Sequence, residues 1–92
     1  MNIPQIKDIR KAYEIYQTRV GLSRADIEEL FGVGRTYAGR LKAMAKEYEK
    51  SKGLPEYSVT TVRTEEAFEA WGLDIKRIRR RARELEKKCT KG

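Results

Sequence analysis

The side chains of this sequence that could do chemistry are mostly cations. The 92 residues contain 21 Lys and Arg against 14 Asp and Glu, which gives a net charge of +7. The excess lies mainly at the end of the chain, because residues 74–92 carry nine basic and three acidic side chains. A basic domain of this size favours a polyanionic partner, with nucleic acid first and an anionic membrane surface second.

Most of the side chains that catalysis or metal binding would need are absent. The sequence has no histidine and one cysteine, Cys89, so it lacks a histidine base, a thiolate zinc site and an internal disulfide. Neighbouring carboxylates such as Glu28 and Glu29 suit surface or helix-cap roles, and no glycine-rich phosphate loop is present. We therefore expect a binding protein and not an enzyme, with no cofactor, metal or small-molecule ligand. No apolar segment is long enough for a membrane span or a signal peptide, and the single cysteine fits a reducing compartment, so we expect a cytoplasmic protein.

The apolar residues that must position these cations recur with helical spacing, beginning near the N-terminus. Five of them follow one another at steps of three and four and would share one helix face: Ile6, Ile9, Tyr13, Tyr16 and Val20. Pro4 suits the first helical position and Gly21 suits the end. These signals predict a leading helix within residues 1–21.

The second predicted helix has a strong start signal. Ser23 is suited to the N-cap, Asp26 stands at the third helical position, and Leu22 can pack on Ile27 across the cap. The helix is expected to end at Gly32. The residues that it offers to the core are Ile27, Leu30 and Phe31.

A third helix is predicted from Arg35 to Glu49, after the short connection Gly32-Val33-Gly34. Its apolar positions again recur at steps of three and four: Ala38, Leu41, Ala45 and Tyr48. The residues that fall off this face, toward solvent, are small, polar or basic: Arg35, Thr36, Gly39, Arg40 and Ala43.

The segment from Ser23 to Ala43 resembles the helix-turn-helix DNA-binding motif. The matching positions are the apolar residue of the first helix, the buried residue and glycine at its end, the apolar turn residue and two buried residues of the second helix: Ile27, Phe31, Gly32, Val33, Ala38 and Leu41. The resemblance implies that the second helix of the pair lies in the major groove of double-stranded DNA.

Two kinds of DNA contact are implied by this resemblance. The residues that would reach the bases are Arg35, Thr36, Tyr37, Gly39 and Arg40. An arginine there could donate two hydrogen bonds to guanine, and the glycine could allow a close approach to a phosphate or a base edge. Lys42 and Lys46 would lie along the DNA backbone. The alternative interpretation is a plain helical hairpin whose arginines are solvated.

Residues 51–63 interrupt the helical pattern. Gly53 and Pro55 predict a loop over residues 51–56, and the β-branched residues that follow predict a short strand over residues 57–62. A single strand needs a partner. We expect residues 52–54 to return beside it and form a small wing, or another subunit to supply the second strand. An extended connector without a strand ladder is the alternative.

A short helix is predicted to follow the strand. Thr64 is expected to cap it, Glu65 and Glu66 occupy its first turn, and Gly72 ends it. The inward-facing residues are expected to be Ala67, Phe68 and Trp71. The strand-then-helix segment from Val62 to Trp71 is similar to the segment that follows the wing in excisionases and MerR-like winged proteins.

The last predicted helix combines an apolar seam with a basic outer face. Asp74 is expected to cap it, and Leu73 can pack on Ile78 across the cap. The seam, with heptad spacing, consists of Trp71, Ile75, Ile78, Ala82, Leu85 and Cys89. It could pack on the leading helix of the same chain, or it could pair with its own copy in a homodimer.

The outer face of this last helix is crowded with cations: Lys76, Arg77, Arg79, Arg80, Arg81, Arg83, Lys87 and Lys88. One interpretation is a solvated face with helix pairs to Glu84 and Glu86. The other is contact with a DNA backbone, which would relieve the repulsion among the cations. We assign five of them to the DNA backbone: Lys76, Arg77, Arg79, Arg80 and Arg83. A basic amphipathic helix on a membrane is a further alternative.

Together these patterns predict a mainly α fold: a small helical bundle with a helix-turn-helix and, after it, a short β element that could form a wing. We expect one domain over residues 1–92, made of a leading helix (1–21), a helix-turn-helix (22–50), a loop and short strand (51–63) and two further helices (64–92). The expected function is sequence-specific binding of double-stranded DNA, as a small transcriptional regulator or recombination accessory factor. The alternative is a helical assembly module that binds another protein and does not read DNA.

Overall fold

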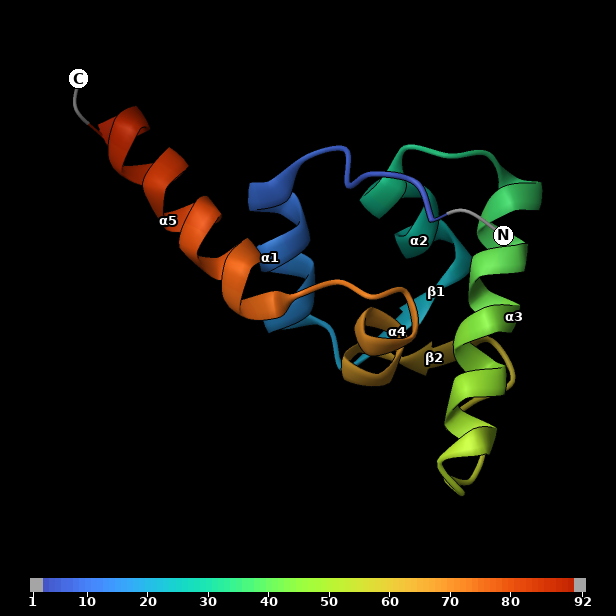
Figure 1. Cartoon of the computed structure of the whole chain (residues 1–92). Coiled ribbons are helices and arrows are strands. Elements are labelled where there is room, and N and C mark those ends of the chain that lie inside the picture. Colours follow the sequence, from blue (N-terminus) through green and yellow to red (C-terminus); the bar gives the residue numbers. More distant parts are fainter. Residues whose placement is uncertain (1–2, 91–92) are drawn as a thin grey trace.

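The computed structural model describes residues 3–90, and the side chains of residues 3–86, as a set of packed helices with one small sheet (Figure 1). In chain order the elements are α1 (Ile9–Thr18), β1 (Gly21–Ser23), α2 (Arg24–Phe31), α3 (Arg35–Ser51), β2 (Thr61–Arg63), α4 (Thr64–Ala70) and α5 (Ile75–Thr90). The predicted mainly α class with a short β element is confirmed.

The leading helix is shorter than predicted at both ends. Asp8 is its N-cap, and the Asp8 carboxylate accepts hydrogen bonds from the backbone N–H groups of Arg10 and Lys11 at 3.0 and 3.3 Å. Pro4 therefore does not start the helix, since a side-chain cap further along satisfies the first free N–H groups. At the other end α1 stops at Thr18, and Gly21 belongs to β1 instead of ending the helix.

The predicted apolar face of this helix is wrong in part. Ala12 and Ile15 are its buried residues, Tyr16 is half-buried, and Val20 lies beyond the helix with 75% of its surface exposed. The reason is that α1 packs against α5 on one side and against α2 on another. The most buried positions are therefore those between the two neighbouring helices.

The predicted start and end of the second helix are confirmed. The Ser23 hydroxyl accepts from the Asp26 backbone N–H at 3.3 Å, and the Asp26 carboxylate accepts from the Ser23 backbone N–H at 2.9 Å. This reciprocal pair is a capping box. Gly32 ends the helix with a left-handed φ of 65°, a conformation that favours glycine.

The third helix runs two residues beyond its predicted end. Ala38, Leu41 and Ala45 are fully buried against the core, as predicted. Near this end of α3, Glu49 is buried although its side chain is a carboxylate. Its carboxylate accepts from the Arg63 backbone N–H at 2.8 Å and lies 3.6 Å from the Arg63 guanidinium, so α3 is tied to β2.

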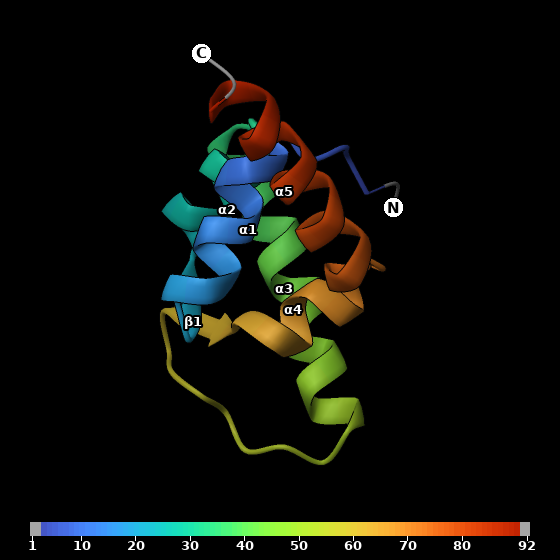
Figure 2. The same ribbon diagram turned by 90° about the vertical axis from the view of Figure 1, so that its left-hand side faces the viewer.

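The strand after the loop is shorter than predicted and lies nearer the C-terminus, and it has a different partner from the one predicted. β2 covers residues 61–63 only, and it pairs antiparallel with β1, so that Leu22 lies opposite Val62. Residues 52–54 do not pair with it, and residues 57–60 belong to the loop. The reason is burial: Leu22 and Val62 have no exposed surface, and this register places both in the core. Figure 2 shows the loop between α3 and β2 crossing below the sheet.

The fourth helix begins without the predicted cap. Arg63 is the N-cap residue, and Thr64 is the first helical residue. The Thr64 hydroxyl donates to the Arg19 carbonyl oxygen at 2.6 Å, and its backbone N–H donates to the Val20 carbonyl oxygen at 2.9 Å. Thr64 therefore joins α4 to the segment before β1, and the prediction that it caps α4 is wrong.

Trp71 anchors the fourth helix on the third. Its indole N–H donates to the Leu41 carbonyl oxygen at 3.0 Å, and its ring meets the Phe31 ring edge to face at 5.2 Å. Phe68 and Ala67 are buried beside it, as predicted. The aromatic core thus joins α2 and α3 to the C-terminal half of the chain.

The last helix packs on the first, which is the intramolecular arrangement of the two left open by the sequence (Figure 2). Asp74 caps it as predicted, since the Asp74 carboxylate accepts from the Lys76 and Arg77 backbone N–H groups at 3.0 and 3.4 Å. Ile78 and Ala82 of the seam are buried. The predicted roles of Lys87, Lys88 and Cys89 lie outside the described side chains.

Candidate nucleic-acid interface

The helices α2 and α3 are joined by a tight turn over residues 32–34. The Gly32 and Val33 backbone N–H groups both donate to the Glu28 carbonyl oxygen, at 2.8 and 3.2 Å. The chain before α1 braces this turn, because the Lys7 backbone N–H donates to the Leu30 carbonyl oxygen at 3.1 Å. The turn is therefore fixed by backbone bonds from both sides, and it holds the start of α3 in one direction.

The first turns of α3 present the predicted base-contacting residues on a rigid helix. Arg35, Thr36 and Arg40 are exposed or partly exposed at its surface. Among the described side chains, none of these three makes an ion pair or a side-chain hydrogen bond, so their donors are free for a ligand. Burial of Ala38 and Leu41 on the opposite side prevents the helix from rolling.

Two other predicted contact residues, Gly39 and Tyr37, are half-buried, unlike Arg35, Thr36 and Arg40. Gly39 is half-buried, and a Cβ atom added there would meet no other atom within 4 Å, so the surface around it is open. The same open space surrounds Gly34, the N-cap residue of α3, which contributes no side-chain cap. Tyr37 is half-buried and packs against the core, so part of its ring faces inward, away from the surface that Arg35 and Arg40 share.

A second group of cations lies beside this surface, where α2 begins. Partial burial lowers the pKa of Lys42 below its ordinary value, and the positive charges of Lys46 and Arg24 lower it further. Arg24, the first residue of α2, was not among the predicted contact residues. Its position directly after the Ser23 cap could have indicated it, since cations at that end of the motif can face a phosphate.

Lys46 is already engaged within the chain. Its ammonium lies 3.1 Å from the Glu56 carboxylate and donates to the carbonyl oxygens of Ser58 and Val59 at 3.3 and 3.0 Å. An ammonium has three N–H donors, and all three have partners here. Lys46 therefore fastens the loop of residues 52–60 to α3, and its predicted contact with DNA would require those bonds to break.

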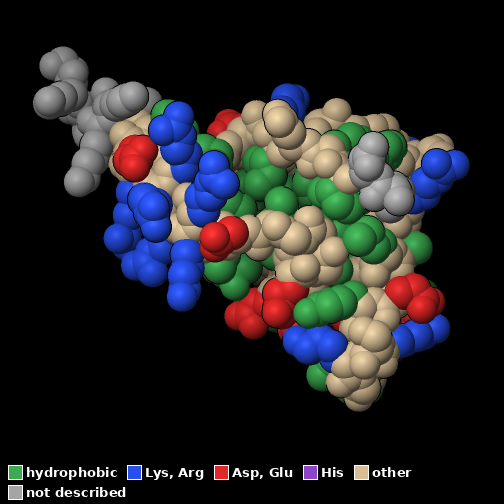
Figure 3. Space-filling model, in the orientation of Figure 1, with side chains coloured by type: hydrophobic (Ala, Val, Ile, Leu, Met, Phe, Trp, Pro, Cys, Tyr) green, Lys and Arg blue, Asp and Glu red, His purple; other side chains and the backbone are tan. Residues whose placement is uncertain are grey.

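The cations of α5 form a separate surface, here called the α5 basic surface: Lys76, Arg77, Arg79, Arg80 and Arg83. All five are exposed, and Figure 3 shows Lys and Arg side chains gathered over this helix. Within the described part of α5, Arg81 pairs with Glu84 at 3.2 Å. The structure does not bring this surface together with α3, because α5 and α3 lie on opposite sides of the molecule (Figures 1 and 2).

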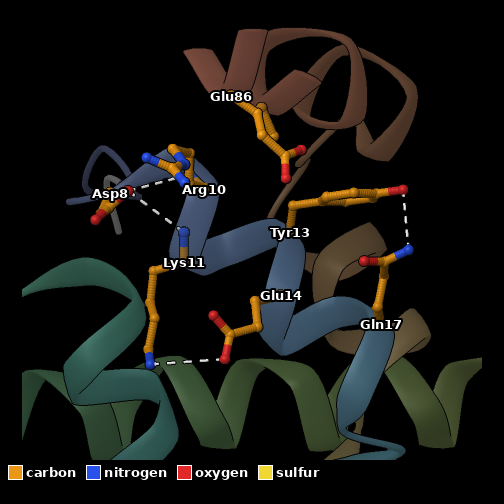
Figure 4. A pocket seen from close by; sticks show the side chains of 8 residues that line it. Asp8, Arg10, Lys11, Tyr13, Glu14, Gln17 and Glu86 are labelled. Carbon is orange, nitrogen blue, oxygen red and sulfur yellow. Dashed lines mark hydrogen bonds and ion pairs between the residues drawn. The ribbon is translucent and has the colours of Figure 1, made fainter. Parts of the chain in front are cut away.

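A surface hollow between α1 and α5 carries several polar side chains whose bonds serve the fold (Figure 4). Asp8 caps α1, and Lys11 pairs with Glu14 at 4.0 Å and with Glu29 at 3.3 Å. The Tyr13 hydroxyl accepts from the Gln17 side-chain amide at 3.0 Å. These groups connect α1 with its neighbours and form no nucleophile-and-base pair.

Over the residues that the structure describes, no group of three or more His, Cys, Asp or Glu side chains is placed to hold a metal ion. Within the same residues, none of the helices has the length and apolar character needed to cross a membrane. Comparisons of the chain with protein-family models, with curated proteins and with solved structures gave no match.

Proposed function

We propose that the protein binds double-stranded DNA in a sequence-specific manner through α2 and α3, as a small transcriptional regulator or a recombination accessory factor. The observation that carries this proposal is the start of α3, where Arg35, Thr36 and Arg40 stand together at the surface without partners among the described side chains. A helix held this firmly by its buried side, with free donors at its N-terminal end, suits insertion into a major groove.

Each part of this surface has a role in the proposal. Arg35 and Arg40 donate to base edges, with guanine as the best acceptor for a two-bond contact. Lys42 and Arg24 neutralise phosphates beside the groove, and the lowered pKa of Lys42 reflects both its partial burial and the positive charge around it. The open surface at Gly39 leaves room for the DNA to come close to the helix backbone.

Selection from a pool of random-sequence duplexes, repeated over a series of salt concentrations, tests this function. The parent chain is expected to enrich one motif. The double variant Arg35→Ala/Arg40→Ala should lose that preference while it keeps weaker, salt-dependent binding. Removal of two bidentate hydrogen-bond pairs at about 1–3 kcal/mol each would lower the preference by a factor of ten or more.

The matched control is Arg77→Ala/Arg80→Ala, which removes the same charge from α5 on the far side of the molecule. This control should select the same motif as the parent. The proposal fails if no motif emerges, or if the α3 double variant selects the parent's motif. In either case the helical assembly module becomes the better interpretation, and capture of a protein partner is the next measurement.

A further inference from the structure

The α5 basic surface combines dense positive charge with a fixed direction. Four of its residues, Lys76, Arg79, Arg80 and Arg83, recur at steps of three, one and three, so they share one face of the helix. At about 1.5 Å of rise per residue this face extends over roughly 10 Å. Within residues 3–86, none of the four makes an ion pair, and Glu84, which lines a surface hollow together with them, pairs with Arg81.

The helix cannot turn these cations away from solvent. Ile78 and Ala82, on the opposite face of α5, are each only 5% exposed and are held against the bundle, with α1 as the main neighbour. The positive charges therefore stay exposed, where a ligand with evenly spaced negative charges can bind them. Duplex DNA, with one negative charge for about every 1.7 Å of its axis, matches a rigid row of cations.

A membrane surface fits this part of the molecule less well. An interfacial helix needs large apolar side chains beside its cations. The exposed large apolar residues of the described chain are Val20, Tyr57 and Val59, and none of them belongs to α5. The α5 basic surface also lacks the small and neutral polar residues that accompany the arginines of α3, so it suits phosphates more than base edges.

The position of α5 decides which DNA it can touch. The packing contacts place α1 against α5 and α4 against α3, and the two views show α5 and α3 on opposite sides of these helices (Figures 1 and 2). The molecule measures 46 × 26 × 21 Å. Lys76, Arg79 and Arg83 line a hollow beside α1, so the α5 basic surface continues along α1, on the side of the bundle that is remote from α3. One straight duplex cannot lie against both.

We propose that one copy of this chain bridges two DNA segments. The first is held at α3 by sequence, and the second is held at the α5 basic surface through its phosphates, independently of sequence. The assignment of α3 rests on the function proposed above, whereas the assignment of α5 rests on its own charge and placement. The two segments can belong to separate molecules or to distant parts of one molecule.

A capture assay tests bridging directly. A duplex carrying the motif selected by the parent is fixed to beads, the protein is added, and a labelled duplex of unrelated sequence is offered. The parent is expected to retain the labelled duplex. The variant Arg79→Ala/Arg83→Ala should retain at least tenfold less, although it still binds the bead duplex. The matched variant Arg79→Lys/Arg83→Lys keeps both charges and should capture as the parent does.

A second measurement tests DNA binding by the α5 basic surface even if the selection experiment yields no motif. In the background of Arg35→Ala/Arg40→Ala, the salt dependence of binding to an unrelated duplex should become shallower when Arg79 and Arg83 are replaced by Ala. The log–log slope is expected to change by about 0.9 for each phosphate that the variant no longer neutralises. An unchanged slope means that α5 does not hold DNA, whatever the role of α3.

Three outcomes would overturn the proposal: no capture by the parent, equal capture by the alanine variant, or capture only of labelled duplexes that carry the motif. The last result would mean that two α3 helices from two copies do the bridging. Sedimentation of the protein alone would then show a dimer.

Discussion

At the scale of single residues, free donors and occupied donors are the clearest distinction in the candidate interface. Arg35 and Arg40 have no partner among the described side chains, whereas Lys46 uses all three of its N–H groups inside the chain. Residue type and spacing predicted Arg35 and Arg40 as base contacts. They could not show the engagement of Lys46, because its partners lie 10 to 13 residues away in a loop without regular structure.

The pKa of the Lys42 ammonium can test whether this group contacts a DNA phosphate. Burial and the charges of Lys46 and Arg24 keep its pKa below the ordinary value of 10.5 in the free protein. A phosphate stabilises the ammonium form, so we expect the pKa of Lys42 to rise when the selected duplex binds, and DNA affinity to weaken as pH rises through the free-protein pKa. Nuclear magnetic resonance titration of the lysine side chains, with and without duplex, measures this shift.

Lys42→Gln provides the control for this titration. It should remove the corresponding pH dependence of DNA affinity while the chain remains folded. A Lys42 pKa that is the same with and without DNA would show that its ammonium does not face a phosphate.

Gly39 allows a second test at this scale, because stability and binding should change in opposite directions. Alanine at this position meets no atom within 4 Å, and alanine stabilises a helix interior by about 1 kcal/mol relative to glycine. We expect Gly39→Ala to raise the free energy of unfolding in urea and to lower affinity for the selected duplex, since a methyl group would stand where DNA approaches. Equal DNA affinity in the variant and the parent would place Gly39 outside the interface.

At the scale of elements, the sequence predicted those helix starts and ends that depend on residues close together in the chain. The cap at Ser23, the end at Gly32 and the cap at Asp74 all depend on neighbours within a few residues, and all are present. The strand partner was predicted wrongly, because β1 and β2 are separated in the sequence by α2, α3 and the loop that follows α3. The hydroxyl of Thr64 was misassigned for the same reason, since its acceptor is Arg19, 45 residues earlier.

Replacement of glycine by alanine should destabilise the turn between α2 and α3, although the same replacement should stabilise α3. Gly32 has a φ of 65°, and a Cβ atom there would lie 2.9 Å from the Lys7 side chain. We expect Gly32→Ala to lower the free energy of unfolding by about 1–2 kcal/mol, from the left-handed backbone alone. Urea unfolding measures this decrease, and Gly39→Ala is the matched control, because the same substitution should have the opposite sign. A neutral Gly32→Ala would mean that the turn readjusts.

At the scale of the whole molecule, the arrangement of the two basic surfaces could not be read from the sequence. The pattern of α5 predicted both its buried seam and its cations. It did not predict on which side of the bundle the cations would lie, since this depends on how α1 and α4 fill the space between α3 and α5. The separation of the α3 and α5 surfaces is therefore a finding of the structure alone.

Acid should loosen the connection between the two halves of the chain. The Lys52 ammonium, at the end of α3, lies 2.9 Å from the Glu66 carboxylate of α4, and this hydrogen bond lowers the pKa of Glu66 below its ordinary value of 4.5. A lowered pKa in the folded state adds stability above pH 4.5, and this stability is lost as pH falls through the folded-state pKa.

We therefore expect Glu66→Gln to be less stable than the parent at pH 7 and to approach it as the pH falls below 4.5. Urea unfolding midpoints over that range measure the difference. Glu65→Gln, in the same helical turn but without an ion pair among the described side chains, is the matched control and should lose less stability at pH 7 than Glu66→Gln does. A constant difference between Glu66→Gln and the parent would show that the bond to Lys52 contributes nothing to acid sensitivity.

The position of Trp71 gives the molecule its own optical reporter. It is the chain's single tryptophan, 3% exposed, lying between Phe31 and Phe68 and bonded to the Leu41 carbonyl oxygen. Its fluorescence therefore comes from one apolar environment and moves to longer wavelength only when α3 and α4 separate. Because the ring lies beneath α3 and not on its outward face, a duplex at that face should leave the emission unchanged. Unfolding can thus be followed at Trp71 while binding is followed on a labelled DNA in the same sample.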